Sequence, residues 1–174
     1  GAVATGCVPR EQVALRSKWL ELWINGAACD RALVDAAALS GAFVGSRAVW
    51  HVQDLRQAVV TRANPASIGL SAIVGMVQPA EPDDAFGVAL TLDPAAPRRV
   101  LAAIAPGLVR EVGVAAARNI AVGERVELPA ERPLVVALDG ERERVLYASD
   151  KGYLVLRADG PWLVDAQRTL RALA

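Results

Sequence analysis

The stretch NPASIGLSAIVGMVQP, residues 64–79, carries no charged side chain and contains the first candidates for ligand contacts. Asn64 is a favoured helix N-cap, and Pro65 suits the first helical position because its missing N–H would have no partner there in any case. A membrane span needs about 20 mostly apolar residues, and this stretch has fewer. We therefore expect a short buried helix over about residues 65–74, ended by Gly75.

The start of this helix offers two kinds of polar contact. The backbone N–H groups of residues 66–68 would have no partner inside the helix and could bind an anion. Ser67 and Ser71 are four residues apart, so their hydroxyls would lie on one helix face and could line a pocket. The commoner alternative is a core helix whose glycines allow close packing and whose serines donate to helix carbonyls. Both interpretations stay open on the residues alone.

Two aspartates elsewhere in the chain are further candidates for ligand contacts. Asp35 lies in the apolar run VDAAAL, and a buried carboxylate there needs a partner. It either recognises a ribose hydroxyl or an amide, or it faces water on an alternating strand. Asp139 ends the apolar run LVVALD and precedes Gly140. This pair either contacts a nucleotide at a strand end or forms the hairpin turn that Asp-Gly favours.

Other reactive residue types do not form a recognisable catalytic or metal site. His51 is the single histidine, and no Ser or Cys motif accompanies it to make a triad. The acidic loop EPDD, residues 81–84, lacks the further ligands that a metal ion needs, so we expect a solvated turn. Cys7 and Cys29 have neither a metal-binding nor a redox spacing, and we expect free thiols in a reducing cytosol.

The elements that position these candidates are predicted to be mainly strands. Residues 19–24 alternate in the period of two that is typical of a strand, and Asn25-Gly26 is a strong signal for a type I′ turn. The returning strand is expected over about residues 30–39. Turn-forming pairs separate the further strands that we expect, which are 46–50, 55–62, 86–92, 98–105, 109–118, 124–129, 133–139, 142–148 and 153–158.

This order of elements predicts a mainly β fold, a two-layer antiparallel β-sandwich. The short buried helix at about 65–74 and a C-terminal helix at about 163–173 complete it, the latter because Leu163, Ala166, Leu170 and Leu173 share one helical face. A length of 174 residues suits a single domain, residues 1–174.

The charge balance excludes some partners. The formal net charge is zero and basic residues are spread along the chain, so nothing steers the molecule toward nucleic acid or anionic membranes. The sequence shows no signal peptide, and we expect a cytoplasmic location. Strand edges and four tryptophans favour a homo-oligomer.

The run RANPASIGLSAIVGMVQP, followed downstream by LVVALDGERERV, resembles the C-terminal β-rich domain of the ATP-NAD kinase family. The resemblance is closest to the branch that includes acetoin-catabolism protein X and covers roughly residues 20–146. The family segment T-G-S-T-A-Y-x-L-S-A-G-G-P is matched, in part, at Leu70, Ser71, Ala72 and Pro79. A strand end of the form Asp-Gly before a polar residue is matched at residues 139–141. The family's Asn-Glu pair is echoed by Val34 and Asp35.

The resemblance implies a dinucleotide site for NAD or NADP, and it implies that this chain forms oligomers. The residues that would face one cleft are Asp35, Asn64, Ser67, Ser71, Asp139 and Gly140. The chain itself requires no cofactor. In the family, the Gly-Gly-Asp-Gly motif lies on a separate N-terminal catalytic α/β domain, which is absent from these residues. ATP and Mg²⁺ would be needed only if such a domain were supplied, so we expect no phosphoryl transfer by this chain alone.

Departures from the family pattern support an alternative. The Gly-Ser-Thr of the kinases falls on residues 64–66, which are Asn-Pro-Ala, so their hydroxyl groups are lost. The Asn of the Asn-Glu pair is replaced by Val34. The alternative is a non-catalytic binding or oligomerisation module that has kept the fold and lost the nucleotide site.

Overall fold

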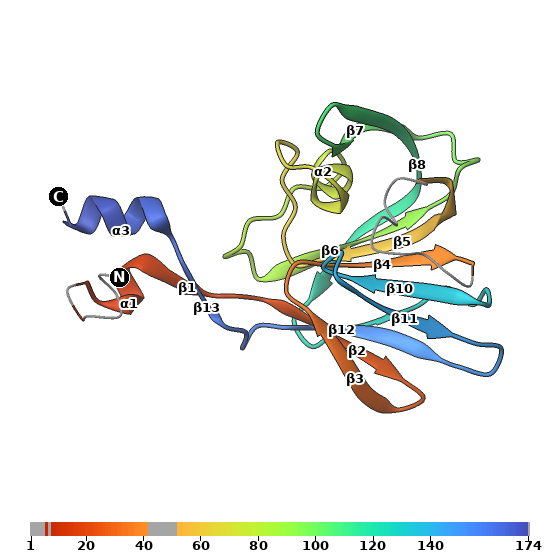
Figure 1. Cartoon of the computed structure of the whole chain (residues 1–174), viewed down its shortest axis with the longest axis horizontal. Coiled ribbons are helices and arrows are strands. Elements are labelled where there is room, and N and C mark those ends of the chain that lie inside the picture. Colours follow the sequence, from red (N-terminus) through yellow and green to blue (C-terminus); the bar gives the residue numbers. More distant parts are fainter. Residues whose placement is uncertain (1–5, 7, 42–51, 174) are drawn as a thin grey trace.

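Three antiparallel sheets carry the part of the chain that this computed structural model describes, residues 6, 8–41 and 52–173. A seven-stranded sheet has the order β11-β10-β4-β5-β6-β8-β7, a four-stranded sheet has the order β3-β2-β12-β9, and β1 pairs with β13 (Figure 1). The strands are β1 Ala14–Arg16, β2 Trp19–Ile24, β3 Ala27–Ala32, β4 Asp35–Ser40, β5 Leu55–Val60, β6 Phe86–Leu92, β7 Arg99–Ala105, β8 Leu108–Ala121, β9 Arg125–Glu127, β10 Leu134–Leu138, β11 Arg142–Leu146, β12 Gly152–Arg157 and β13 Trp162–Val164. The helical segments are α1 Arg10–Val13, η2 Val52–Asp54, α2 Leu70–Gly75 and α3 Ala166–Leu173.

The predicted sandwich is confirmed by the core between the two larger sheets. Leu20 and Leu22 of β2 and Leu154 of β12 belong to one buried cluster with Ala36 and Ala38 of β4. The period-2 alternation in β2 therefore points its leucines inward. The fold is mainly β, and every strand pairing in the described part of the chain is antiparallel.

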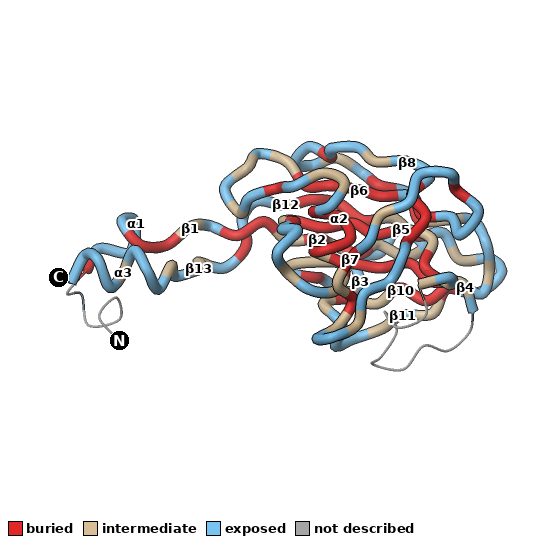
Figure 2. The backbone as a smooth tube through the Cα atoms, turned by 90° about the horizontal axis from the view of Figure 1, so that it is seen from above, coloured by how far each residue is buried: buried red, intermediate tan, exposed pale blue. Residues whose placement is uncertain are grey.

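The other face of the seven-stranded sheet is covered as well. Ala37 and Leu39 of β4 belong to a second buried cluster with Leu70 and Ile73 of α2. Because β4 is buried on both faces, its middle residues form a continuous apolar run rather than an alternating one. Figure 2 shows this buried interior beneath the exposed loops of the body.

The strand predicted over residues 30–39 is wrong as a single strand. β3 ends at Ala32 in the four-stranded sheet, and β4 begins at Asp35 in the seven-stranded sheet. Leu33 and Val34 form the crossover between the two layers. A periodic pattern does not reveal this change of sheet, because both parts remain extended.

The other strand predictions that fall on described residues are confirmed. The strand at residues 19–24 is β2, and the turn after it has positive φ at Asn25 (52°) and Gly26 (80°), as a type I′ turn requires. The strands predicted from 55–62 to 153–158 correspond in order to β5 to β12, and β8 is longer than expected. The predicted strand at 46–50, His51 and Cys7 lie outside the described residues. Cys29 is exposed on β3 and forms no disulfide within the described ranges.

The predicted short helix is present, but it starts later than expected. Asn64 does not cap a helix at residue 65: its Oδ1 accepts the N–H of Ala66 at 2.8 Å, and its carbonyl accepts the N–H of Ser67 at 3.0 Å. These bonds close a local turn that competes with the helix. α2 then begins at Leu70 after Gly69, whose φ of 74° favours glycine.

The glycine at the end of α2 permits close packing, as the core-helix interpretation of this stretch expects. A Cβ atom built on Gly75 would overlap the backbone of Asn64 and Pro65. The end of the helix therefore lies directly against the turn that precedes it. Glycine is needed here for space rather than for a positive φ.

A buried lysine connects the body to the acidic loop at residues 81–84. Lys18 is almost fully buried, and its Nζ donates to the carbonyls of Glu81, Asp84 and Phe86 at 3.1, 2.8 and 2.6 Å. Burial lowers the pKa of this ammonium, and the charges of Asp84 and Asp83 oppose that effect. The loop thus has a specific internal contact, which the sequence analysis did not predict.

The two ends of the described chain form an arm that projects from the body (Figures 1 and 2). Strand β1 pairs with β13, and α1 lies beside α3. The C-terminal helix is confirmed, but it begins at Ala166, because residues 162–164 form β13 and Asp165 caps the helix by accepting the N–H of Arg168 at 2.9 Å. α3 has no buried residue, so its apolar face is not part of the core. No helix in the described ranges is both long and apolar enough to cross a membrane.

Candidate functional site

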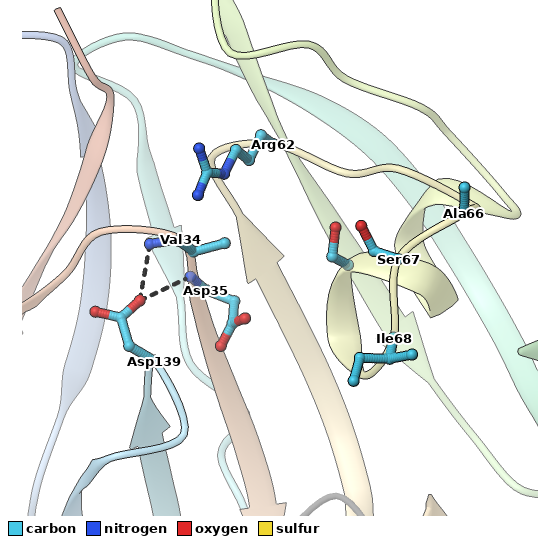
Figure 3. Close-up of a pocket in the computed structure, with 8 residues that line it drawn as sticks. Val34, Asp35, Arg62, Ala66, Ser67, Ile68 and Asp139 are labelled. Atoms are coloured by element: carbon cyan, nitrogen blue, oxygen red, sulfur yellow. Dashed lines mark hydrogen bonds between the residues drawn. The ribbon is translucent and has the colours of Figure 1, made fainter. Parts of the chain in front are cut away.

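The ends of several strands and the turn before α2 surround one cavity of about 540 Å³, which we call the Asp35 cavity. This volume lies within the range of about 300–1,000 Å³ that is typical of small-molecule sites. Figure 3 shows Val34, Asp35 and Asp139 on one wall, Ser67 and Ile68 on the other, and Arg62 between them. The residues that line the Asp35 cavity are Val34, Asp35, Arg62, Ala66, Ser67, Ile68, Ser71 and Asp139.

Asp139 lies in the tight turn between β10 and β11. Its φ is 52° and that of Gly140 is 66°, and Glu141 donates its N–H to the carbonyl of Leu138 at 3.1 Å. The turn interpretation of Asp-Gly is therefore correct. The same turn directs the Asp139 side chain away from its own hairpin, toward the crossover between the sheets.

The Asp139 carboxylate holds that crossover in place. Oδ2 accepts the N–H of Leu33 at 2.8 Å, and Oδ1 accepts those of Val34 and Asp35 at 2.8 and 3.2 Å. The backbone N–H of Asp139 donates in return to the carbonyl of Asp35 at 2.9 Å. One carboxylate thus satisfies three consecutive amides that leave one sheet and enter another, which is a structural role.

Asp35 is the first residue of β4, and its side chain borders the cavity. It is half-buried, and its carboxylate accepts no hydrogen bond from any described residue. Burial, and to a smaller extent the nearby negative charge of Asp139, raise the pKa of Asp35 to about 6. Asp35 is therefore a polar group that the described protein leaves without a donor.

The turn before α2 supplies hydroxyl groups rather than an anion-binding helix tip. The prediction of free amides at residues 66–68 is wrong for Ala66 and Ser67, whose N–H groups donate to Asn64. The hydroxyl of Ser71 accepts the N–H of Asn64 at 3.1 Å and can still donate its own proton. The Ser67 hydroxyl makes no hydrogen bond to the described residues.

Two predicted site residues are not part of the lining. Asn64 is exposed and shapes the turn, and Gly140 is exposed and forms the hairpin. Asp35, Ser67, Ser71 and Asp139 are brought together around one cavity. Their role as ligand contacts stays a prediction.

Arg62 is the lining residue that the sequence analysis missed. It follows β5, and the pairing of Asp35 with Val60 brings the end of β5 beside the start of β4. Its guanidinium forms no ion pair with the carboxylates of the described residues. The available signal was a basic residue two positions after the end of a buried strand. It could have been placed near Asp35 only if the pairing of β4 with β5 were known.

Metal binding has no support in the described ranges, where no group of three His, Cys, Asp or Glu side chains could hold an ion. The cavity instead combines a carboxylate without a donor, an unpaired guanidinium and two hydroxyls. Such groups can accept sugar hydroxyls and neutralise phosphate oxygens.

The sequence model of a protein family described as the acetoin catabolism protein X C-terminal domain matches residues 18–159. This range covers both larger sheets and the cavity. The chain belongs to the acetoin catabolism protein X family. Acetoin catabolism protein X of Cupriavidus necator is 35% identical over 98% of this chain.

The match to this relative extends through the arm, whereas the family domain ends where the arm begins. The chain spans 49% of the length of the acetoin catabolism protein X relative. Both descriptions refer to acetoin catabolism and not to a kinase. The ATP-NAD kinase part of the resemblance therefore remains a prediction.

Proposed function

We propose that this domain is the dinucleotide-binding half of a kinase-like protein, with NAD or NADP as the ligand of the Asp35 cavity. The setting suggested by the relative's name is acetoin catabolism. A second domain would supply ATP, Mg²⁺ and the groups that position the phosphates, because phosphoryl transfer depends on those parts. The proposal draws support from the relative, which has about twice the length of the matched region.

The observation that carries this proposal is the state of the Asp35 carboxylate. It is half-buried beside a second carboxylate, and its pKa is raised to about 6, yet no described residue donates to it. Ribose hydroxyls would provide the missing donors, as they do for acidic residues in dinucleotide sites. Arg62 on the same cavity would face the phosphates.

Thermal unfolding in the presence of NAD, NADP and ATP tests the binding function. At a concentration about 100-fold above Kd, a dinucleotide should raise Tm by roughly 5–10 °C. Asp35→Ala should remove most of this rise, measured against the variant's own Tm. Glu111→Gln, an exposed change on β8, is the matched control and should keep it. An unchanged rise in Asp35→Ala would contradict the proposed site.

A second candidate function is an assembly module without a nucleotide. It is favoured by two observations: Asp139 and Ser71 are already used in internal hydrogen bonds, and the arm leaves large apolar side chains exposed. Leu170 and Leu173 of α3 are 68% and 51% exposed. A two-stranded sheet with so little buried core is only marginally stable by itself, and contact with a partner would increase its stability.

Light scattering during size-exclusion chromatography tests the assembly function. The chain should elute as a dimer or a larger homo-oligomer, because the arm would bury Leu170 and Leu173 against a second copy. The double variant Leu170→Asp, Leu173→Asp should elute as a monomer that still unfolds cooperatively, since neither residue belongs to the core. If the unmodified chain is still a monomer at about 0.1 mM, its self-association is weaker than that of typical specific homodimers. That result would exclude this function.

A further inference from the structure

We propose that a second cavity extends the Asp35 cavity into one elongated site, in which a nucleobase stacks on Trp19 and a phosphate pairs with Arg31. This inference rests on the proposed function, since it assigns the second half of the same dinucleotide. The second cavity, which we call the Trp19 cavity, has a volume of about 680 Å³. The lining residues that matter here are Trp19, Arg31, Leu33, Asp139, Glu141 and Asp159.

The two cavities adjoin at the crossover between the sheets. Asp139 lines both of them, while Leu33 lines the Trp19 cavity and Val34 lines the Asp35 cavity. Leu33 is 43% exposed although it is apolar. An exposed leucine between two polar cavities offers a contact for the apolar faces of a sugar or a base. A ligand that occupies both cavities would therefore pass over the Leu33–Val34 crossover.

Trp19 provides an aromatic surface that is held in place. Its Nε1–H donates to Oδ1 of Asp159 at 2.7 Å, and this bond lowers the pKa of Asp159. The indole is half-buried, so it is neither part of the core nor fully solvated. Stacking of a base on such a side chain contributes about 1–3 kcal/mol.

Arg31 provides a positive charge that the neighbouring acid does not neutralise. Asp30 pairs with Arg144 at 2.8 Å and with Arg142 at 3.6 Å. Arg142 also donates to the backbone carbonyl of Arg31 at 2.6 Å. The guanidinium of Arg31 itself has no hydrogen bond or ion pair to the described residues. It is therefore available to a phosphate, for which the planar guanidinium is well suited.

Glu141 completes the chemistry of the Trp19 cavity. Its carboxylate is exposed and makes no ion pair within the described part of the chain. It would repel a phosphate placed beside it, but it can accept the hydroxyls of a ribose. A dinucleotide has two riboses. Asp139 and Asp159 already accept internal hydrogen bonds, so among the described residues each cavity has one carboxylate without an internal donor, Asp35 in one and Glu141 in the other. This pairing favours a dinucleotide over a mononucleotide as the ligand class.

Calorimetry and tryptophan fluorescence with NAD test the elongated site. Arg31→Gln should weaken NAD binding about tenfold and should also weaken AMP binding, because AMP carries both the base and the phosphate that the proposal places in the Trp19 cavity. Asp35→Ala should weaken the binding of NAD but not of AMP, because AMP is too short to engage both cavities. Arg110→Gln is the control and should leave NAD binding unchanged. Arg110 is exposed on β8, which lies toward the edge of the seven-stranded sheet opposite β10 and β11. NAD should quench the fluorescence of the unmodified chain and of Trp23→Phe, but not that of Trp19→Phe.

The outcomes separate this inference from the proposed function. If NAD binds and Asp35→Ala prevents it, while Arg31→Gln keeps full affinity and Trp19→Phe keeps the quench, the ligand occupies the Asp35 cavity alone. That result overturns the elongated site and leaves the proposed function intact. If neither NAD nor NADP binds the unmodified chain at millimolar concentration, both are overturned.

Discussion

Replacing Asp139 by alanine should lower the free energy of unfolding by about 3 kcal/mol at pH 7.5, because three backbone amides lose their acceptor. Water can reach the N–H of Leu33, but the amides of Val34 and Asp35 are partly buried. The loss is partly offset, since removal of one carboxylate also relieves its repulsion with Asp35. Urea unfolding followed by circular dichroism measures the change.

A matched control identifies the cause. Asp93 also accepts a backbone N–H, that of Ala95 at 2.8 Å, but in an exposed turn. Asp93→Ala should cost about 1 kcal/mol or less. Asp139→Asn should lie between the two alanine variants, because its amide oxygen can still accept while its NH₂ group faces a donor. Equal losses for Asp139→Ala and Asp93→Ala would show that the crossover does not depend on this carboxylate.

The Asp35→Asn variant should be more stable than the unmodified chain by roughly 2–3 kcal/mol at pH 7.5, and equal to it at about pH 3.5. The pKa of Asp35 is raised from 3.8 to about 6 in the folded state. Between these values the folded state binds more protons than the unfolded state, so the free energy of unfolding falls as pH rises through this window. Asparagine has no charge to bury and avoids this loss.

The measurement is the difference in unfolding free energy between Asp35→Asn and the unmodified chain from pH 3.5 to 8. Taking the difference removes the contributions of other carboxylates, such as Glu21 and Asp150, whose pKa values are lowered. The difference should grow between about pH 4 and 6 and stay constant above that range. A difference independent of pH would mean that Asp35 is not desolvated in the folded protein.

The ionised Asp35 carboxylate lowers the stability of the folded protein. Asp139 stabilises the crossover, and in doing so it places its charge beside Asp35. A carboxylate kept in an unfavourable environment at a cavity is a pattern typical of functional sites. Dinucleotide binding would relieve part of this cost, because ribose hydroxyls donate to the ionised carboxylate.

Much of the site could be predicted from the sequence. Asp35 and Asp139 stood out because each is a carboxylate attached to an apolar run, and Ser67 and Ser71 because they share a face at a spacing of four. The structure places these four around one cavity, whereas Asn64 and Gly140 shape turns beside it. Arg62 was missed, because only the pairing of β4 with β5 brings it near Asp35.

The sequence by itself determined most strands of the two larger sheets, the hairpin turns at residues 25–26 and 139–140, and the presence of α2 and α3. These features depend on local causes, which are the side-chain period of two, the tolerance of Asn-Gly and Asp-Gly for positive φ, and helical spacing. Such causes act within a few residues and can be recognised without the rest of the chain.

Only the tertiary structure decided where the chain changes sheet, where α2 begins and how the two ends form an arm. The crossover at Leu33 depends on Asp139, which is 106 residues away in the chain. The N–H of Gly69 donates to Ala103 of β7 at 2.8 Å, so the start of α2 depends on a strand that follows it in sequence. β1 and β13 come from opposite ends of the chain. Contacts between such distant residues leave no local pattern, because each partner is compatible with many others until the chain has folded.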